Sequence, residues 1–357
     1  MTKKARIKYV VNCRFATQDT TGVQRYALEC SRILKNSFMN DIVFVAPKGH
    51  INPFIKDELC IKQFGFFKGY FWEQISLPLY SFMNSSILMC FCGTPPIFYK
   101  KTIYTIHDLS FVRYPEFFNL YYQFFYKFFV RLAFERFLGI SAVSQFTKNE
   151  LIDFYGRREI FVVGNTVNHL NGVNESTELP VVLKNEKYFL TVGSIDPRKN
   201  IEQLIKIFLK ENVNAKLVIV GQKNRVFTEL KDLSKLRSSN IIFTGYLTDN
   251  QLVAYYRNAE CFIYPSLYEG FGIPPLEALY FDTPVLLSDI PAHREIYGNY
   301  AHYFPLSGIT NIEKNAEIAV SKKKSAKIHG KKHPLIIKYS PANQKKQLLK
   351  MALNFDR

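Results

Sequence analysis

The sequence lacks the signatures of several protein classes. Its six cysteines form no CxxC pair and no cysteine–histidine spacing that suits zinc, so neither a zinc site nor a redox dithiol is predicted. No window approaches about 18 uninterrupted apolar residues, and the apolar run in MTKKARIKYVVNCRF is too short for a signal peptide. We therefore expect a cytosolic protein with reduced cysteines and no membrane-spanning helix.

Three nucleotide-site and metal-site motifs are also missing. There is no Walker-type GxxxxGK[ST], which argues against an ATPase. The stretch GFGIPP has Pro275 where a dinucleotide fingerprint has its third glycine, so a nicotinamide or flavin site is disfavoured. No Asp-x-Asp is present that would hold a metal ion.

Acidic residues are scarce relative to basic ones. Asp and Glu number 30 against 47 Lys and Arg, which gives a net charge of +17. So basic a chain indicates an anionic partner: nucleic acid, a phosphorylated substrate or an acidic membrane surface.

Short apolar runs rich in β-branched residues alternate with helix-like stretches in two sets. The first set predicts strands at 7–11, 42–46, 87–91, 102–106, 140–143 and 159–163. The second predicts strands at 188–192, 216–220, 240–243, 261–264 and 284–287, with helices at 201–210, 227–236, 249–257 and 274–281. A polar stretch at 167–186 is typical of a linker. We expect an α/β protein with two doubly wound, Rossmann-like domains facing across a cleft.

Ligands of such sheets bind at the carboxyl ends of the strands, so we expect site residues in the loops there. After the strand at 188–192 come Gly193, Arg198 and Lys199, the last two just before a helix that Asn200 could cap. Two cations beside a helix N-terminus suit a phosphate, although a solvated basic loop is the plain alternative.

The stretch SLYEGFGIPPLEAL, at 266–279, carries two carboxylates around a glycine-rich loop. Gly272 and its neighbours can bring backbone N–H groups to a ligand, and Pro274 suits the first turn of a helix. Glu269 and Glu277 could accept hydrogen bonds from sugar hydroxyls, while Glu277 could also merely favour the helix dipole.

The first half offers two weaker candidates. Gly22 lies where a loop becomes a helix, and His107 follows the strand at 102–106. A lone histidine is often structural. Because His107 stands at the end of a strand, a ligand contact and a structural role are both open for it.

Together these segments resemble glycosyltransferase family 4, the retaining enzymes with two Rossmann-like domains known as GT-B. The resemblance covers roughly residues 10 to 300 and is carried, in order, by TGVQRYA, WEQISLPLY, TIHDLSFVRYPEFF, SAVSQFTKNEL, VGNTV, VGSIDPRKN, FTGYLTD and YPSLYEGFGIPPLEAL. The most specific motif is Glu269-x7-Glu277 around Gly-Phe-Gly.

The resemblance implies a role for each carboxylate and cation. Glu277 would accept the ribose hydroxyls of a nucleotide, and Glu269 would contact the transferred sugar near the reacting centre. Arg198 and Lys199 would hold the diphosphate and stabilise the leaving group. His107 would contact the donor sugar.

It also implies donor contacts through the backbone. Phe271, Gly272 and Ile273 would offer N–H groups to sugar and phosphate, and Gly22 would let the N-terminal loop approach the phosphates. Tyr246 would frame the nucleobase. Gly193 would be a further donor-binding residue. No metal and no other cofactor would be needed.

The resemblance also divides the chain. It implies an acceptor-binding domain over 1–166, a linker over 167–186, a nucleotide-sugar-binding domain over 187–338 and a helix over 339–357 that packs back on the first domain.

Two positions depart from the family pattern. Asn165-Thr166 replaces a common Asn-Gly, and Ser194 stands near a frequent arginine, so Arg198 must supply the guanidinium.

Two segments favour a membrane surface. Residues 117–137 interleave aromatic residues with Lys127, Arg131 and Arg136, which suits a membrane interface or a core helix, one face for each. The basic run at 322–332 suits anionic lipid or solvent. We expect a peripheral protein on the cytoplasmic face of the inner membrane.

The function predicted is a hexosyltransferase of bacterial O-antigen, lipopolysaccharide or other surface polysaccharide synthesis. Its partners would be a GDP- or UDP-linked nucleotide sugar, with GDP-mannose favoured, and a polyprenyl-diphosphate-linked glycan, and no nucleic acid. One alternative is a nucleic-acid-binding protein, suggested by the net charge of +17. Others are a phosphorylase or an epimerase of the same architecture.

Overall fold

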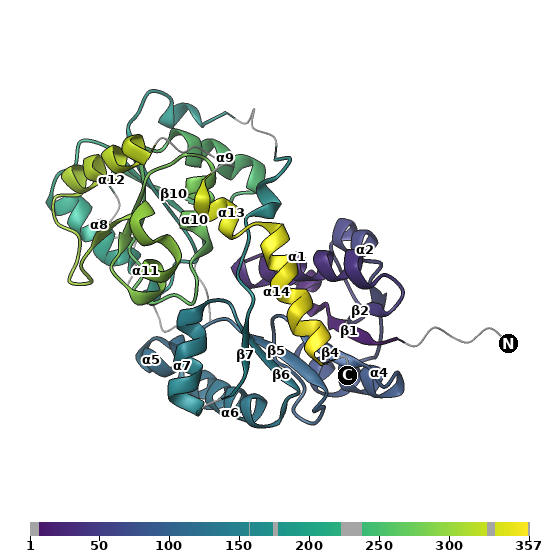
Figure 1. Ribbon diagram of the computed structural model, residues 1–357. Helices are drawn as coiled ribbons and strands as arrows, with labels where there is room; N and C mark the ends of the chain where they lie inside the picture. The colour runs from purple at the N-terminus through teal and green to yellow at the C-terminus, as the bar shows by residue number, and fades with distance from the viewer. Residues whose placement is uncertain (1–6, 157, 174–177, 223–237, 327–332, 356–357) are drawn as a thin grey trace. The chain divides into compact units, whose positions relative to one another are not determined.

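The computed structural model describes residues 7–156, 158–173, 178–222, 238–326 and 333–355. The chain forms two units (Figure 1). Unit 1 comprises Met1–Leu109, Phe124–Thr166 and Pro341–Arg357, and unit 2 comprises Ser110–Gln123 and Val167–Ser340. Each unit has a parallel sheet with helices packed around it, so the α/β prediction with two Rossmann-like units is confirmed.

Within the described residues, the sheet of unit 1 has seven parallel strands in the order β3-β2-β1-β4-β5-β6-β7. The strands are β1 (Tyr9–Asn12), β2 (Ile42–Ala46), β3 (Lys62–Gln63), β4 (Ile87–Cys90), β5 (Thr102–Ile106), β6 (Gly139–Ala142) and β7 (Ile160–Val162). The chain leaves β1 toward β2 and later returns to its other side with β4, so the order reverses between β1 and β4. The sequence did not predict β3, because its two polar residues carry no alternation of apolar and polar side chains.

The helices of unit 1 lie between its strands in the sequence, except the one at the C-terminal end. They are α1 (Gly22–Phe38), α2 (Pro53–Leu59), α3 (Gly69–Phe71), α4 (Leu77–Met83), α7 (Gln145–Tyr155) and α14 (Pro341–Asn354), with a π-helical turn η2 (Trp72–Ser76) between α3 and α4. Ser144 caps α7, because its hydroxyl accepts the backbone N–H of Thr147 at 3.0 Å.

The helix α6 (Leu120–Arg136) has one buried and one exposed apolar side. Its buried side chains are Phe129, Val130, Ala133 and Phe134, whereas Leu120, Tyr121, Phe124 and Phe128 are each more than half exposed. The helical pattern predicted over 117–137 therefore serves the core along only part of its length.

The helix α14 lies beside α1 although the two are more than 300 residues apart in sequence (Figure 1). Gln344 and Gln347 bind both backbone groups of Gly164 in unit 1: Gln344 Nε2 donates to the Gly164 carbonyl at 2.8 Å, and the Gly164 N–H donates to Gln347 Oε1 at 2.9 Å. Gly139 leaves room for the Phe355 ring, which would lie 2.6 Å from any Cβ added there. These contacts attach the C-terminal segment to unit 1.

Within the described residues, the sheet of unit 2 has six parallel strands in the order β10-β9-β8-β11-β12-β13. They are β8 (Tyr188–Val192), β9 (Lys216–Val220), β10 (Ile241–Gly245), β11 (Cys261–Tyr264), β12 (Val285–Ser288) and β13 (His302–Phe304). The edge strand β13 was not predicted, because three residues are too few to set a period.

The described helices of unit 2 are α5 (Ser110–Arg113), α8 (Ile201–Lys210), α9 (Asp249–Asn258), α10 (Ile273–Tyr280), α11 (Pro291–Tyr297), α12 (Ile312–Ala326) and α13 (Pro334–Lys338). Several of these helices, α8, α10 and α12 among them, pack on this sheet. In α8, Ile201, Leu204, Ile205 and Phe208 recur at helical spacing and pack into the core. The helix predicted at 227–236 lies outside the described residues.

One predicted boundary is wrong. The sequence placed all of 1–166 in one domain, but Ser110–Gln123 belongs to unit 2. There the Tyr114 ring stacks on Phe117 and meets the Tyr268 ring edge-on at 5.9 Å, and its hydroxyl donates to the Leu267 carbonyl at 3.4 Å. These contacts join residues about 150 positions apart, which no local pattern reveals.

Candidate active site

Three side chains meet at the carboxyl edge of the unit 2 sheet, one from the segment after β8 and two from the end of β11 and the loop after it. Lys199 Nζ lies 2.5 Å from Glu269 Oε1 and 2.6 Å from the Tyr264 hydroxyl. Tyr264 ends β11, and Lys199 closes the short turn after β8, so two adjacent strands deliver them. The structure thus brings together two residues that the sequence predicted separately, Lys199 and Glu269, and adds Tyr264.

The Glu269 carboxylate is held in its ionised form. Burial alone would raise its pKa, but the charges of Lys199 and Arg198 and the hydrogen bond from Lys199 lower the pKa of Glu269 to about 2. A carboxyl with so low a pKa carries no proton near neutral pH. Glu269 can therefore accept hydrogen bonds from a ligand but cannot act as a general acid.

Arg198 and Lys199 are positioned by Asp196. The Asp196 carboxylate accepts the Lys199 backbone N–H at 3.3 Å and the Ser194 hydroxyl at 2.7 Å, and it lies 3.8 Å from Arg198 Nε. Asp196 therefore caps this turn, whereas Asn200, for which a cap of the next helix was predicted, makes no capping bond with its side chain. Its amide binds the Gln203 side chain instead.

The loop before α10 presents backbone donors. In the described part of the chain, the N–H groups of Phe271, Gly272 and Ile273 have no hydrogen-bond acceptor. Gly272 takes the left-handed conformation (φ +78°) at the helix N-cap, and Pro274 follows directly inside the helix. The buried Phe271 ring packs edge-on against another ring, so only its backbone is available to a ligand. Three free N–H groups at a helix N-terminus suit an anionic oxygen.

The second carboxylate, Glu277, lies in the same helix and is oriented by two side chains that the sequence did not predict. His169 Nε2 lies 3.0 Å from Glu277 Oε1, and the Tyr256 hydroxyl donates to Oε2 at 2.8 Å. These two contacts fix the directions of both carboxylate oxygens. His169 comes from the stretch interpreted as a linker, where no pattern indicated a site residue.

Glycines allow the loops after β8 and β9 to approach each other. Gly193 donates its N–H to the Val220 carbonyl at 2.9 Å. A Cβ at Gly221 would collide with the Gly193 carbonyl, so Gly221 has to be glycine, and the sequence missed this. Tyr246 follows β10 and is 55% exposed, so its ring is open to a planar ligand.

His293, in α11 after β12, is a further residue that the sequence missed. It is fully buried: its Nδ1 lies 2.9 Å from the Ser288 carbonyl, and its Nε2 has no partner among the described residues. Burial lowers the pKa of His293 to about 4, so the ring is neutral. Its place shortly after the predicted strand at 284–287 is a signal that the sequence does carry.

Two predicted site residues lie in unit 1. Gly22 is the first residue of α1, and it has no positive φ. The His107 ring is held by the Phe91 carbonyl, 2.7 Å from Nε2, and by an edge-on contact with Tyr26. Burial lowers the pKa of His107. The predicted donor contacts of these two residues remain predictions.

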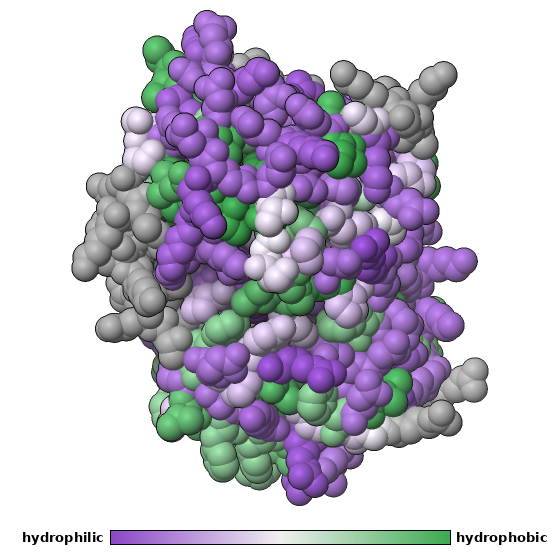
Figure 2. Space-filling view, turned by 90° about the vertical axis from the view of Figure 1, so that its left-hand side faces the viewer, coloured by the Kyte–Doolittle hydropathy of each residue, from purple (hydrophilic) through white to green (hydrophobic). Residues whose placement is uncertain are grey.

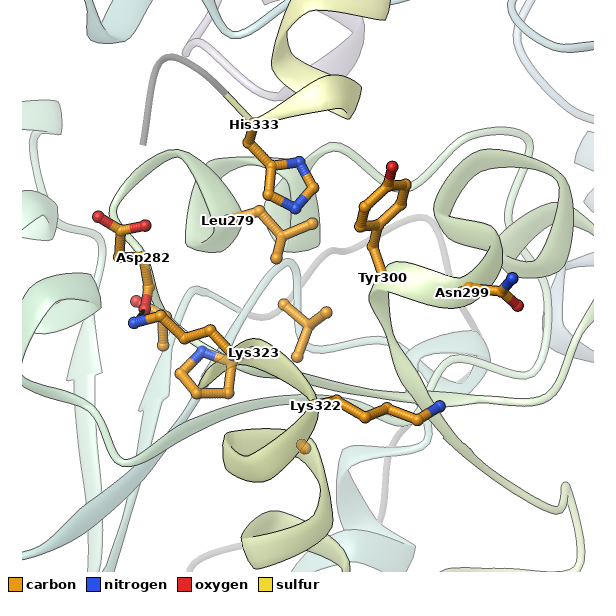
Figure 3. A pocket seen from close by; sticks show the side chains of 11 residues that line it. Leu279, Asp282, Asn299, Tyr300, Lys322, Lys323 and His333 are labelled. Atoms are coloured by element: carbon orange, nitrogen blue, oxygen red, sulfur yellow. Dashed lines mark hydrogen bonds between the residues drawn. The ribbon is translucent and has the colours of Figure 1, made fainter. Parts of the chain in front are cut away.

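A pocket of about 450 Å³, its open mouth included, lies at the other edge of the unit 2 sheet, where β12 begins (Figure 3). Lys322 and Lys323 border it, but each ammonium donates to a backbone carbonyl, of Ala301 and Asp282 respectively. These lysines begin the basic run at 322–332, and its residues 327–332 lie outside the described part. The run's predicted lipid contact gains no support from its described lysines.

Neither a metal cluster nor a membrane span is found in the described ranges. They contain no group of three or more His, Cys, Asp or Glu side chains placed to bind a metal ion. In the same ranges no helix is both long and apolar enough to cross a membrane. On the face drawn in Figure 2, hydrophilic residues predominate and hydrophobic ones form separate patches.

The two Rossmann-like sheets, each with its loops at the carboxyl edge, define the GT-B class of fold. A glycosyltransferase from Rickettsia africae superposes with a TM-score of 0.69 over 98% of this chain and 99% of that chain, at 16% identity. Anabaena HepE, solved with UDP-glucose, gives 0.66 at 12% identity over 97% and 99% of the two chains. At such identities the likeness concerns the fold alone.

The sequence comparisons add a likeness beyond the fold. Residues 179–322 match the model of "Glycosyl transferases group 1". The O-antigen chain mannosyltransferase RfbU of Salmonella typhimurium is 31% identical over 244 residues, which are 65% of this chain and 64% of RfbU. The serotype-specific mannosyltransferase WbdA of Escherichia coli is 31% identical over 46% of this chain and 22% of its own length.

The matches therefore span less than two thirds of these relatives' length. They confirm the resemblance to bacterial mannosyltransferase-like glycosyltransferases. Neither the family nor these relatives favours a nucleic-acid-binding protein, a phosphorylase or an epimerase.

Proposed function

We propose that this protein is a retaining hexosyltransferase that moves a hexose from a nucleotide sugar to a glycan in bacterial O-antigen or surface polysaccharide synthesis. GDP-mannose is the favoured donor, because the relatives RfbU and WbdA are named mannosyltransferases. The observation that carries the proposal is one arrangement in unit 2. The free N–H groups of 271–273 lie next to the ionised Glu269 and open the helix that holds the oriented Glu277.

This arrangement fits the charge changes of the reaction. Breaking a bond to a nucleoside diphosphate places negative charge on the leaving phosphate, and donors already aimed at that charge lower the barrier. Arg198 and Lys199 lie beside Asp196 and Glu269, so their charges are largely balanced before a ligand binds. The backbone N–H groups are then the important anion donors of this site, and the proposed chemistry needs no metal.

Each carboxylate has its own task in the proposal. Glu269 accepts hydrogen bonds from hydroxyls of the transferred hexose and stays ionised. Its negative charge stabilises the positive charge that develops on the sugar carbon. Glu277, held by His169 and Tyr256, accepts the two ribose hydroxyls. A site with hydrogen-bond acceptors already in place prefers a ligand that has hydroxyls there over one that lacks them.

Nucleotide binding tests this proposal first. Thermal unfolding is measured with GDP, UDP, TDP, CMP, GDP-mannose and UDP-glucose; a ligand that binds only the native state raises Tm. We expect a rise with GDP and GDP-mannose that is lost in Glu277→Gln. The control is Glu317→Gln, a change at an exposed glutamate of α12. A rise with UDP alone refutes the GDP preference, and no rise with any nucleotide refutes the transferase proposal.

The acceptor is proposed to be a polyprenyl-diphosphate-linked glycan. Radiolabelled GDP-mannose is incubated with the protein and with lipid extracts of bacteria that make O-antigen, and the product is isolated and its anomeric configuration read by NMR. Label in the lipid fraction with the donor's configuration is expected. An inverted product would contradict retention.

The exposed side of α6 supports a peripheral location on the cytoplasmic face of the inner membrane. Its exposed apolar residues lie on the same helix as Lys127, Arg131 and Arg136, a combination that favours anionic lipid surfaces. Replacing these three cations by Gln should reduce flotation with phosphatidylglycerol vesicles, whereas the same change at Lys345 and Lys346 of α14 should not. Unchanged flotation of the triple variant removes α6 from the proposal.

A further inference from the structure

The motif Trp72-Glu73-Gln74 carries part of the family resemblance, but no role was assigned to it. It forms the π-helical turn η2 in unit 1, a geometry that is rare and frequent at functional sites. Gln74 holds the loop after β4: its Nε2 donates to the Pro95 carbonyl at 3.1 Å, and its Oε1 accepts the Ile97 N–H at 3.0 Å. The turn thereby fixes the chain at the carboxyl end of β4.

Glu73 links this turn to the neighbouring strand β1. Its fully buried carboxylate accepts Asn12 Nδ2 at 2.9 Å and the Thr94 N–H at 3.3 Å, and Arg14 Nε lies 3.0 Å from Oε1. The contact with Arg14 is an ion pair rather than an aligned hydrogen bond. A Cβ at Gly93 would collide with Glu73 Oε1, so the loop is closed tightly over the carboxylate.

Arg14 is the part of this cluster that faces outward. Its side chain is only 18% exposed, and its terminal N–H groups meet no acceptor within the residues that the structure describes. A guanidinium offers donors in a flat fork that matches phosphate oxygens. A largely buried guanidinium whose terminal N–H groups have no acceptor is suited to bind an anion.

The position of Arg14 agrees with a ligand site. Arg14 follows β1, and Thr94 follows β4, the two strands between which the sheet order reverses. In doubly wound sheets, ligands bind outside the carboxyl ends of the strands at this reversal. The candidate active site of unit 2 contains none of these residues.

The Tyr70 hydroxyl lies near the guanidinium. It is close enough to Arg14, Thr94 and Tyr126 for all three to influence its pKa. Burial is the main cause that raises the pKa of Tyr70, so its hydroxyl stays protonated and can donate. One guanidinium with a hydroxyl nearby is a combination suited to a sugar phosphate or a diphosphate.

We propose that Arg14, oriented by the buried Glu73, binds a phosphate of the acceptor at the β1–β4 edge of unit 1. The ligand class is a diphosphate joined to a prenyl chain. The identification of this ligand as the acceptor rests on the proposed function. The diphosphate site itself can be tested without any transfer reaction. A donor nucleotide is the other source of a diphosphate, and the test separates the two.

The probe is farnesyl diphosphate, with farnesol as the uncharged control, and binding to the full-length protein is measured by calorimetry. Wild type should bind farnesyl diphosphate and not farnesol. Arg14→Gln should weaken this binding about ten- to hundredfold, as expected for the loss of charge-assisted hydrogen bonds. The rise in Tm with nucleotides should stay unchanged in that variant.

Arg32→Gln is the matched control, because Arg32 is an ion-paired arginine of unit 1 on α1. It should leave farnesyl diphosphate binding unchanged. Arg14→Lys should bind with intermediate affinity, since it keeps the charge and loses the fork. If Arg14→Gln does not fold, Arg14→Lys and competition by inorganic pyrophosphate decide the question.

Three results would overturn the proposal: equal binding by wild type and the folded Arg14 variants, equal binding of farnesol and farnesyl diphosphate, or no competition by pyrophosphate. Loss of nucleotide binding in Arg14→Gln with farnesyl diphosphate binding intact would assign Arg14 to the donor instead. If no nucleotide raises Tm but farnesyl diphosphate binds through Arg14, the proposed function fails and the diphosphate site stands.

Discussion

The ion pair between Lys199 and Glu269 allows a prediction with a definite sign and size. Glu269 is buried and its pKa falls from the ordinary 4.5 to about 2, which corresponds to about 3 kcal/mol of stability at neutral pH. In wild type this contribution is fully present above about pH 4.5 and is lost as the pH falls toward 2.

Lys199→Met removes the nearer cation and leaves a buried carboxylate with less compensation. Burial then dominates, so the pKa of Glu269 rises above that in wild type. We expect a loss of about 3 kcal/mol at pH 7, in the range found when one partner of a buried pair is removed. The deficit should shrink between pH 7 and pH 5, because protonation of Glu269 removes the unpaired charge.

Urea denaturation followed by far-UV circular dichroism at pH 7 and pH 5 measures this effect. Tryptophan fluorescence would report on the wrong unit, since the single tryptophan is Trp72 in unit 1. The double variant with Glu269→Gln should be more stable than the sum of the two single losses predicts. An equal deficit at both pH values, or strict additivity, would refute the electrostatic reasoning.

Three further predictions concern the same unit. Gly221→Ala should force the loops after β8 and β9 apart, because its Cβ collides with the Gly193 carbonyl; a lower Tm and a smaller rise with nucleotide are expected, and an unchanged Tm would contradict the collision. His293→Gln should flatten the fall in stability between about pH 6.5 and 4, since a histidine whose pKa is lowered to about 4 favours unfolding as the pH drops through that window; an identical slope in urea titrations would exclude His293 as its source. Tyr256→Phe removes one hydrogen bond to Glu277, worth about 1 kcal/mol, so nucleotide affinity should fall about fivefold in calorimetry while Tm without ligand changes little.

The strands and the loops that follow them were largely predictable. β2, β5, β8, β9 and β11 have the predicted bounds, because a buried parallel strand is a continuous apolar run that is visible in any local window. The short strands β3 and β13 lie at sheet edges, where few residues are buried and the signal disappears. Lys199, Glu269 and Glu277 were predictable from the segments that follow strands, because polar residues there face a ligand rather than the core.

The partners of those residues were not predictable. His169 and Tyr256 orient Glu277 from positions 108 and 21 residues away, and Glu73 orients Arg14 across 59 positions. Such pairs depend on which strands lie side by side. The spacing of apolar residues within one element does not predict that order.

The sequence by itself determined the α/β class, most strand positions and the motif residues of the candidate site, because burial repeats along each element with the element's own period. Only the tertiary structure decided that Ser110–Gln123 packs with unit 2 and that Gln344 ties the last helix to unit 1. It also decided which cation meets which carboxylate. The reason is physical: hydrogen bonds and ion pairs act over a few ångströms in space, whatever the separation along the chain.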